Sequence, residues 1–297
     1  MVDNCAKYTG FINPKKNVWY FGNPFDYKNF TFIKQDCRNF FKKNLNEYYD
    51  YVLHLAAIVG GREIIENNPL AVAEDLSIDS NFWSWVTKSK PKKVICFSSS
   101  ASYPIHFQKK NNFKLLKESM ISFNKEIGVP DMTYGWSKLT CEYLAKIAFE
   151  KHNIKSVVYR PFSGYGEDQH KNYPFTGIIY RAMNNKNKKI FKVWGSGNQM
   201  RDFIHIDDCV KGVIKTMNKI NDSSALNLST GKLLSFKMLA KKICNQIGYD
   251  PEIIGTTNKP EGVFARGGCT LKQEKYGFKH QLNIDEGITS ALKYQPN

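Results

Sequence analysis

Short apolar runs alternate with longer segments of helical periodicity through the first two thirds of the chain. Apolar runs of strand length occupy residues 51–57, 94–98 and 156–161, and we expect each to be a buried strand. Residues 69–86 and 134–152 lie between them and have apolar positions at the spacing of a helix face. This alternation is typical of a parallel sheet with crossover helices and predicts an α/β fold.

The pattern loosens after Gly166, where loops rich in asparagine and lysine surround short elements before a helix-length segment at residues 235–247. These later residues predict a second, smaller lobe. The expected division is residues 1–165 and 200–232 for the larger lobe, and residues 166–199 and 233–297 for the smaller lobe.

Length and composition narrow the class of protein. A chain of 297 residues, 42% of them hydrophobic, is long enough for a buried core. No stretch approaches the roughly 20 apolar residues that cross a bilayer, and the N-terminus does not resemble a secretory signal. We therefore expect a soluble protein with no membrane partner and a cytoplasmic location. The seven cysteines form no CxxC pair, which favours reduced thiols and no metal site.

The net charge of +16 could indicate a polyanionic partner, because lysine-rich surfaces attract nucleic acids and anionic membranes. However, the basic residues are spread along the chain and form no block with aromatic residues between them. Solvated surface lysines explain the charge better, so nucleic-acid binding is not expected. The charge still favours an anionic small substrate.

The strongest chemical signal is the spacing of Tyr134 and Lys138 at the start of a predicted helix. Residues four apart share a helix face, so the lysine ammonium group would lie near the phenol. Such an ammonium group stabilises a phenolate and allows the tyrosine to move a hydroxyl proton as a general acid or base. This spacing is also common in surface helices, so the surrounding sequence must decide whether the pair is catalytic.

A serine-rich loop, residues 97–104, follows the predicted strand at residues 94–98. Open α/β sheets bind ligands at the carboxyl ends of their strands. A serine hydroxyl there can hydrogen-bond the oxygen whose proton the tyrosine takes. Together with Tyr134 and Lys138, the loop provides a candidate Ser-Tyr-Lys triad.

On these residues the chain resembles the extended short-chain dehydrogenases that act on nucleotide sugars, in the epimerase/dehydratase group, over essentially its whole length. The matching stretches are residues 55–57, 97–104, 134–138, 160–162 and 201–208. The resemblance implies a Rossmann-like, doubly wound parallel sheet with a smaller C-terminal substrate-binding lobe. It also implies NAD as cofactor, a nucleotide sugar as substrate, and a homodimer formed through two helices per subunit, including the helix of Tyr134.

The resemblance assigns Tyr134 as the catalytic acid/base, with Lys138 tuning it and holding the nicotinamide ribose. The position of the triad serine depends on the direction of counting. Counting back from the tyrosine of the Tyr-Pro pair gives Ser99, whereas counting forward from the end of the strand gives Ser100. We favour Ser99.

On the cofactor side, the resemblance places Asp3 and Asn4 at the end of the family's second strand, where they bind the adenosine ribose. A carboxylate at this place favours NAD over a 2′-phosphorylated cofactor. The other implied cofactor contacts are Asp36 and Cys37 at the adenine, the strand end Leu55, Ala56 and Ala57, and Pro161 and Phe162 beside the nicotinamide.

On the substrate side, Arg201 is similar to the arginine that clamps the substrate diphosphate, a task suited to its fork of donors. Arg266 is expected to serve the same diphosphate, and Ser100 and Ser163 are further implied contacts. Ser163 stands where the family commonly has asparagine, and Cys269 stands where an aspartate is expected.

The sequence departs from the family at its start. It contains no GxGxxG or GxxGxxG motif, although the family's first strand and glycine-rich loop supply N–H groups for the cofactor pyrophosphate. Family comparison places about thirty further residues before Asp3. Two alternatives follow: an upstream segment is left out, or the chain is a catalytically silent, truncated relative that keeps the fold and the dimer surface.

The residues after the triad serine bear on the reaction. Dehydratases of the family have an acidic pair there to protonate the leaving hydroxyl, whereas Ser100 and Ala101 follow here, which disfavours dehydration. The Gly60-Gly61 pair and residues 260–266 resemble the branch with GDP-mannose 3,5-epimerase and GDP-fucose synthase, but that branch has a cysteine where Ala101 stands. We therefore expect NAD-dependent 4-epimerisation through a keto sugar, with a nucleotide-sugar oxidoreductase as the alternative.

Overall fold

The structure, a computed structural model, describes residues 1–6, 13–16, 19, 22–59, 62–186, 188–256 and 261–294, without the side chains of residues 62–64. The strands are β1 (Val2–Asp3), β2 (Ile33–Lys34), β3 (Tyr51–His54), β4 (Lys93–Phe97), β5 (Gln108–Lys109), β6 (Asn112–Phe113), β7 (Ser156–Pro161), β8 (Ser163–Tyr165), β9 (Ile190–Trp194), β10 (Met200–Arg201), β11 (Phe203–His205), β12 (Asp222–Leu228), β13 (Leu234–Ser235), β14 (Glu252–Thr256) and β15 (Ala265–Arg266). The α-helices are α1 (Cys37–Lys43), α2 (Arg62–Asn67), α3 (Pro69–Val72), α4 (Glu74–Ser89), α5 (Met132–His152), α6 (Pro174–Asn184), α7 (Ile206–Thr216), α8 (Phe236–Ile247), α9 (Leu271–Lys275) and α10 (Ile284–Tyr294). Short 3-10 helices are η2 (Pro14–Lys16), η3 (Pro24–Asp26), η4 (Ser100–Ser102), η5 (Ile105–Phe107) and η6 (Glu118–Met120).

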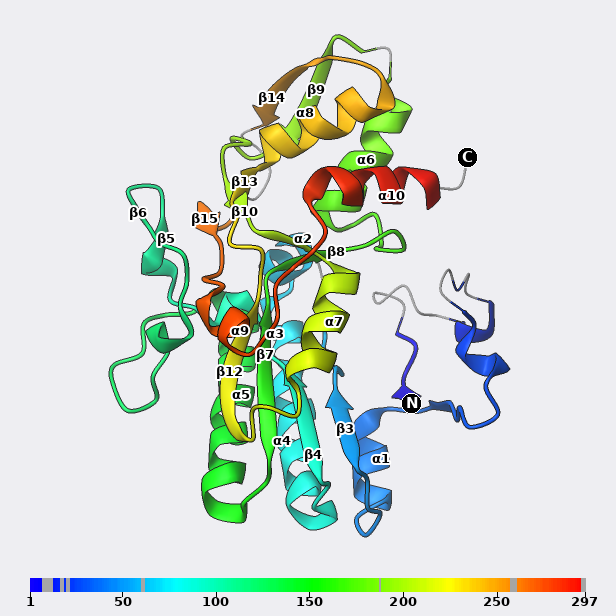
Figure 1. The fold of residues 1–297 in the computed structure, drawn as a ribbon, viewed down its shortest axis with the longest axis vertical. Coiled ribbons are helices and arrows are strands. Elements are labelled where there is room, and N and C mark those ends of the chain that lie inside the picture. The colour runs from blue at the N-terminus through cyan, green and yellow to red at the C-terminus, as the bar shows by residue number, and fades with distance from the viewer. Residues whose placement is uncertain are drawn as a thin grey trace.

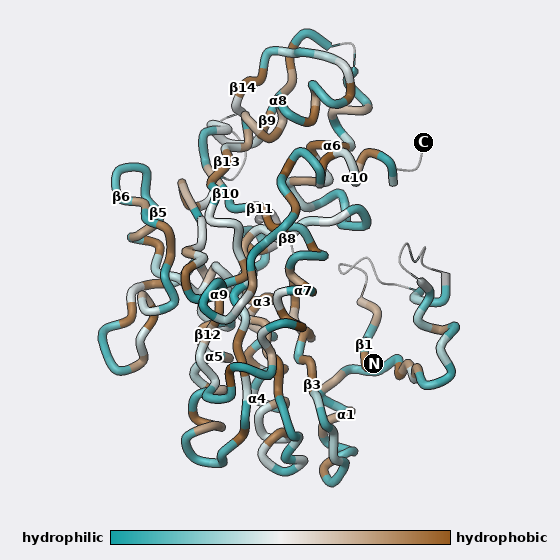
Figure 2. Tube along the Cα trace, viewed as in Figure 1, coloured by the Kyte–Doolittle hydropathy of each residue, from teal (hydrophilic) through white to brown (hydrophobic). Residues whose placement is uncertain are grey.

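The central sheet has four parallel strands in the order β12-β7-β4-β3 (Figure 1). Because side chains alternate between the two faces of a strand, Val94 and Cys96 pack with α4 and α5 in one core, whereas Ile95 packs with α7 in another. Figure 2 shows this as brown, hydrophobic stretches along the inner strands and teal on outer loops such as the β5–β6 turn. The predicted α/β fold with a parallel sheet is confirmed, and β7 has the predicted bounds.

The strand expected at residues 51–57 is shorter and less buried than predicted. It ends at His54, and the residues Tyr51 and Leu53 are 41% and 52% exposed. Within the described ranges β3 pairs only with β4, while β1 and β2 form a separate parallel pair. The prediction of a buried strand is wrong here, because burial also depends on lateral neighbours that a hydropathy pattern does not reveal.

The helix expected at residues 69–86 consists of two helices, α3 and α4, which meet at Ala73. The Ala73 N–H group bonds to the Leu70 carbonyl oxygen at 3.1 Å, a tighter turn than that of an α-helix, and this separates the two. The catalytic-helix candidate α5 begins at Met132 and ends where Asn153 adopts a left-handed φ of 53°. None of the helices in the described ranges combines the length and apolarity needed to span a membrane.

A second group of elements lies at the top of Figure 1. The parallel pair β9 and β14 packs with α6, α8 and α10 around a core that includes Phe191, Leu239, Ile243 and Ile288. The chain passes from this group through β10 and β11 and then returns to the central sheet as β12. The carboxyl ends of β4 and β7 therefore face a cleft that both groups line.

Candidate active site

Tyr134 and Lys138 lie one turn apart near the start of α5. The Lys138 Nζ atom is 5.8 Å from the centroid of the Tyr134 ring, and the lysine side chain is buried. Although burial lowers the pKa of Lys138, the charges of Tyr134, Asp75 and Asp79 raise it above its usual value. A charged ammonium group thus lies below the phenol, as the spacing predicts.

Gly135 brings the serine loop close to this helix. A Cβ atom at Gly135 would lie 2.5 Å from the Ala101 carbonyl oxygen, so only glycine allows this approach. The same oxygen accepts a hydrogen bond from the Asp131 N–H group at 2.9 Å. The loop after β4 and the first turn of α5 are therefore held together as one unit.

Ser99 and Ser100 occupy different environments within that loop. Ser99 is the N-cap of η4, and its Oγ atom accepts a hydrogen bond from the Ala101 N–H group at 3.1 Å. Ser99 and Ala101 line the cleft beside Tyr134. Ser100 is buried and lies outside the described set of residues that line the cleft.

The cleft has a volume of about 570 Å³ and lies between the two groups of elements. It brings together most of the residues expected to act on the substrate and the nicotinamide. These are Ser99, Tyr134, Phe162, Ser163, Arg201 and Arg266. Pro161 ends β7 next to Phe162 but is not among the described lining residues.

Arg201 and Arg266 lie side by side although they are far apart in the sequence. β10 and β15 pair in parallel with Arg201 opposite Arg266. Arg201 donates to the carbonyl oxygens of Met200 at 2.8 Å and Val263 at 2.9 Å, and Arg266 forms an ion pair with Asp131 at 2.6 Å. Two guanidinium groups on adjacent strands form a site suited to an anion with two charged groups.

A second cavity, of about 820 Å³, collects the residues expected to bind the adenosine half of the cofactor. Its lining includes Asp3, Asn4, Asp36, Cys37, Leu55, Ala56 and Ala57. Asp3 accepts a hydrogen bond from the Cys5 N–H group at 2.6 Å, and Asn4 accepts one from Ala6 at 3.1 Å. Burial raises the pKa of Cys37 to about 11, so the thiol is neutral.

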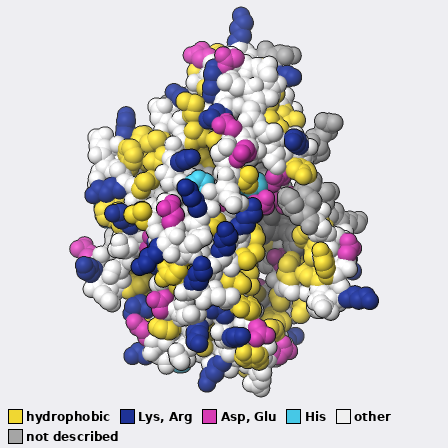
Figure 3. Space-filling model, in the orientation of Figure 1, with side chains coloured by type: hydrophobic (Ala, Val, Ile, Leu, Met, Phe, Trp, Pro, Cys, Tyr) yellow, Lys and Arg dark blue, Asp and Glu magenta, His cyan; other side chains and the backbone are white. Residues whose placement is uncertain are grey.

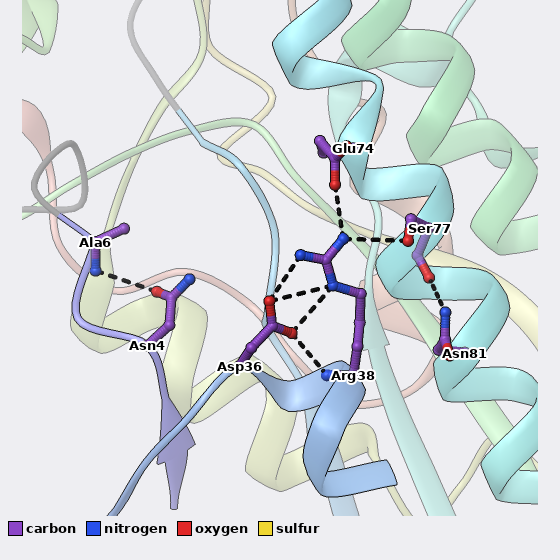
Figure 4. A network of polar contacts seen from close by, with 7 residues as sticks. All are labelled: Asn4, Ala6, Asp36, Arg38, Glu74, Ser77 and Asn81. Atoms are coloured by element: carbon purple, nitrogen blue, oxygen red, sulfur yellow. Dashed lines mark hydrogen bonds and ion pairs between the residues drawn. The ribbon is translucent and has the colours of Figure 1, made fainter. Parts of the chain in front are cut away.

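Arg38 is a residue of this cavity that sequence reasoning missed. Its guanidinium group contacts Asp36 at 2.7 Å and also Glu74 and Ser77 on α4, as Figure 4 shows. The bonds to Asp36 and Glu74 raise the pKa of Arg38, and the bond from Arg38 lowers the pKa of Asp36. The position of Arg38 directly after the Asp36-Cys37 pair was the available signal.

The cleft also contains residues that no sequence motif indicated. Among them are Asp131, Lys171, Tyr173 and Gln199. Of these, only Asp131 lies close in sequence to a predicted catalytic residue. The Gly60-Gly61 pair and Pro260 lie outside the described residues.

The two cavities are adjacent, because Val59 lines both. The Asp3 carboxylate lines one of these cavities and Tyr134 lines the other. This arrangement fits a dinucleotide whose adenosine lies at the strand ends of β1 and β2. Fold and site together define an enzyme of the Rossmann type that binds a dinucleotide at the carboxyl ends of a parallel sheet.

The comparisons with known proteins agree with this class. Residues 20–229 match the NAD dependent epimerase/dehydratase family, and the chain belongs to this family. It is therefore an enzyme of an NAD-dependent family whose members act on nucleotide sugars.

Two kinds of relative stand out among the matches. The chain is 30% identical over 305 residues to an uncharacterised UDP-glucose epimerase of Bacillus subtilis, with coverage of 99% of this chain and 88% of that protein. Its fold matches UDP-glucose 4-epimerase of Thermotoga maritima with a TM-score of 0.77 at 20% identity, covering 90% and 85% of the two chains. It also matches a GDP-6-OMe-4-keto-L-xylo-heptose reductase of C. jejuni with a TM-score of 0.75 at 20% identity, covering 86% and 84%.

Proposed function

We propose that the protein is an NAD-dependent nucleotide-sugar 4-epimerase. The observation that supports this most directly is the composition of the cleft, where Ser99, Tyr134 and the Arg201–Arg266 pair face one space. The 30% identity to a UDP-glucose epimerase over nearly the whole chain supports the same reaction.

In this proposal the Tyr134 phenolate accepts the proton of the sugar C4 hydroxyl as the keto group forms, and Ser99 Oγ hydrogen-bonds the same oxygen. Lys138 stabilises the phenolate through its charge and binds the nicotinamide ribose. When bound, NAD supplies a reversible hydride acceptor. Tyr134 then returns the proton to the same oxygen once the hydride has come back to the opposite face of the sugar, so atoms and electrons balance.

The substrate diphosphate would occupy the Arg201–Arg266 pair. Both side chains project from paired positions of β10 and β15 into the cleft that holds Tyr134. Diphosphate binding at this place would leave the sugar to reach towards Ser99 and Tyr134. Ala101 beside them has no proton-transferring group, which supports chemistry at C4 alone.

The direct test is turnover of UDP-glucose by the purified chain with NAD, with the galactose epimer followed by NMR and GDP sugars assayed in parallel. We expect interconversion without net consumption of NAD, and a substrate deuterated at C4 should keep its label. Tyr134→Phe should lower turnover by roughly 10²- to 10⁴-fold while NAD still binds. Tyr48→Phe, at an exposed tyrosine that is not among the described residues lining either cavity, is the matched control.

Other outcomes separate the alternatives. Net oxidation or reduction of the cofactor with a nucleotide-linked sugar or keto sugar would instead support the oxidoreductase alternative. The similarity of this chain's fold to the C. jejuni reductase is compatible with that alternative. Absence of NAD binding together with absence of turnover would contradict both, and would support the catalytically silent relative.

We further propose that the enzyme forms a homodimer through α4 and α5. Trp136 and Tyr143 on α5 are 48% and 45% exposed, and Leu76 on α4 is 42% exposed. Such large apolar side chains favour a helical interface between two copies. Sedimentation should show a dimer that Trp136→Glu dissociates; a monomeric wild-type protein would contradict this.

A further inference from the structure

A group of buried charges lies directly below Tyr134. Lys138 Nζ is 3.8 Å from Asp75 Oδ2 on α4, and Asp79 follows one turn later on the same helix. The residues Lys138, Asp75 and Asp79 are 6%, 1% and 2% exposed, so water screens their charges weakly. Their mutual interactions are therefore strong compared with those of surface ion pairs.

The two carboxylates have different partners. Asp79 Oδ1 contacts His54 Nε2 at 2.8 Å, and the His54 ring stacks on Phe82 with centroids 3.8 Å apart. Asp75 Oδ1 instead accepts a hydrogen bond from the Ile58 N–H group, in the loop that follows β3. Asp75 Oδ2, on the side of Lys138, accepts no hydrogen bond within the described ranges.

Asp75 therefore connects two parts of the site. The Ile58 loop follows Leu55, Ala56 and Ala57, which line the second cavity, and Lys138 lies below the cleft. A buried carboxylate oxygen without a hydrogen bond is costly unless a charge compensates it, and within the described structure Lys138 is the cation beside it. The titratable groups around Asp75 are Asp79 on α4, Tyr134, Lys138 and Cys141 on α5, His54 on β3 and Cys96 on β4.

We propose that Asp75 is a positioning residue whose ionised carboxylate holds the Lys138 ammonium group below Tyr134 and ties it to the cofactor-side loop at Ile58. The inference rests on the proposed function, in which Lys138 binds the nicotinamide ribose and assists Tyr134. Protonation of Asp75 removes this attraction and leaves Asp79 as the carboxylate whose charge still acts on Lys138. NAD affinity should therefore fall below a lower pH limit that Asp75 sets.

The pH range of this limit follows from the environment of Asp75. Burial raises the pKa of Asp75 to about 6, with the charge of Asp79 adding to it, while Lys138 and the Ile58 N–H group lower it. The carboxylate is ionised above this value and becomes neutral below it. Lys138 is thus held more firmly near neutral pH than after mild acidification.

The first measurement is the NAD affinity by calorimetry between about pH 8 and about pH 5. Wild-type affinity should fall roughly tenfold on acidification through the titration of Asp75. Asp75→Asn should bind roughly tenfold more weakly near neutrality and lose this dependence. Asp79→Asn is the matched control on the same helix. It should keep the dependence and shift it to lower pH, because one negative charge near Asp75 is gone.

The second measurement needs no cofactor. Infrared difference spectra follow the C=O band of the protonated Asp75 carboxyl group, assigned by its loss in Asp75→Asn. Because coupling is reciprocal, Lys138→Met should move this titration to higher pH. Thermal unfolding of each variant confirms that it is folded.

The outcomes are separable. An unchanged infrared titration in Lys138→Met, or an acid dependence of NAD binding that survives Asp75→Asn, would overturn the positioning role. If the wild type binds no NAD at any pH, the proposed function fails, whereas the infrared titration still decides whether Asp75 and Lys138 are coupled.

Discussion

The cleft around Tyr134 and the second cavity around Asp36 are built in different ways. In the cleft, the contacts join distant segments: Arg266 to Asp131, Ala101 to Asp131, and Arg201 to Val263. In the second cavity, three polar side chains accept hydrogen bonds from the backbone N–H group two residues further along the chain. These pairs are Asp3 with Cys5, Asn4 with Ala6, and Asp36 with Arg38. The second cavity thus relies more on local turns than the cleft does, although Arg38 also reaches Glu74 and Ser77 on α4.

The charged groups follow the same division. Beneath the cleft, Arg160 and Glu142 form an ion pair at 2.5 Å with both side chains 3% exposed, and Glu142 also accepts from Ser98 at the start of the serine loop. At the second cavity, Arg38 and Asp36 pair with side chains 30% and 29% exposed. Figure 3 shows that lysines and arginines are otherwise scattered over the visible face. Burial therefore makes the first pair matter far more to stability.

The largest expected effect tests this difference in burial. Arg160→Met leaves Glu142 buried without a counter-charge and should cost about 3–5 kcal/mol of unfolding free energy. Arg38→Met removes partly exposed ion pairs with Asp36 and Glu74 and should cost less than about 1 kcal/mol for each pair. Denaturant unfolding measures both, and equal losses would show that the two sides do not differ as the geometry indicates.

A smaller effect tests whether the cleft alone binds the diphosphate. Arg201→Met should weaken UDP binding by about 2 kcal/mol, because a charge-assisted hydrogen bond is lost, and should leave NAD affinity unchanged. Arg201 lines only the cleft, so the NAD affinity is the internal control. Calorimetry with UDP and with NAD gives both values. An equal loss of UDP and NAD affinity would show that the substitution disturbs the fold as a whole and not diphosphate binding in the cleft.

The smallest effect concerns the cofactor end. Asp3→Asn keeps the side-chain oxygen that accepts from Cys5 but removes the charge, so NAD should bind about fivefold more weakly and NADP more tightly. Asp26→Asn, at an exposed position in η3, serves as the control. An unchanged preference for NAD over NADP would show that Asp3 does not select the cofactor.

Sequence reasoning reached some residues and missed others for identifiable reasons. Tyr134 and Lys138 could be predicted because helix geometry places residues four apart on one face. Asp75 was missed because its partner Lys138 lies on another helix, and a carboxylate in a charged helix is usually solvated. The break at Ala73 and the exposure of Leu53 were missed because local hydrogen bonding and lateral strand pairing leave no periodic signal.

The amino-acid sequence alone was enough to predict the alternation of strands and helices, the Tyr134–Lys138 pair, the serine loop at a strand end and the family. These depend on periodicity and on neighbours along the chain. The folded chain was needed to show that Arg201 lies opposite Arg266, that Ser99 and not Ser100 lines the cleft, and that Asp75 lies against Lys138. Those contacts join segments that only packing brings together, and burial then sets the strength of their electrostatics.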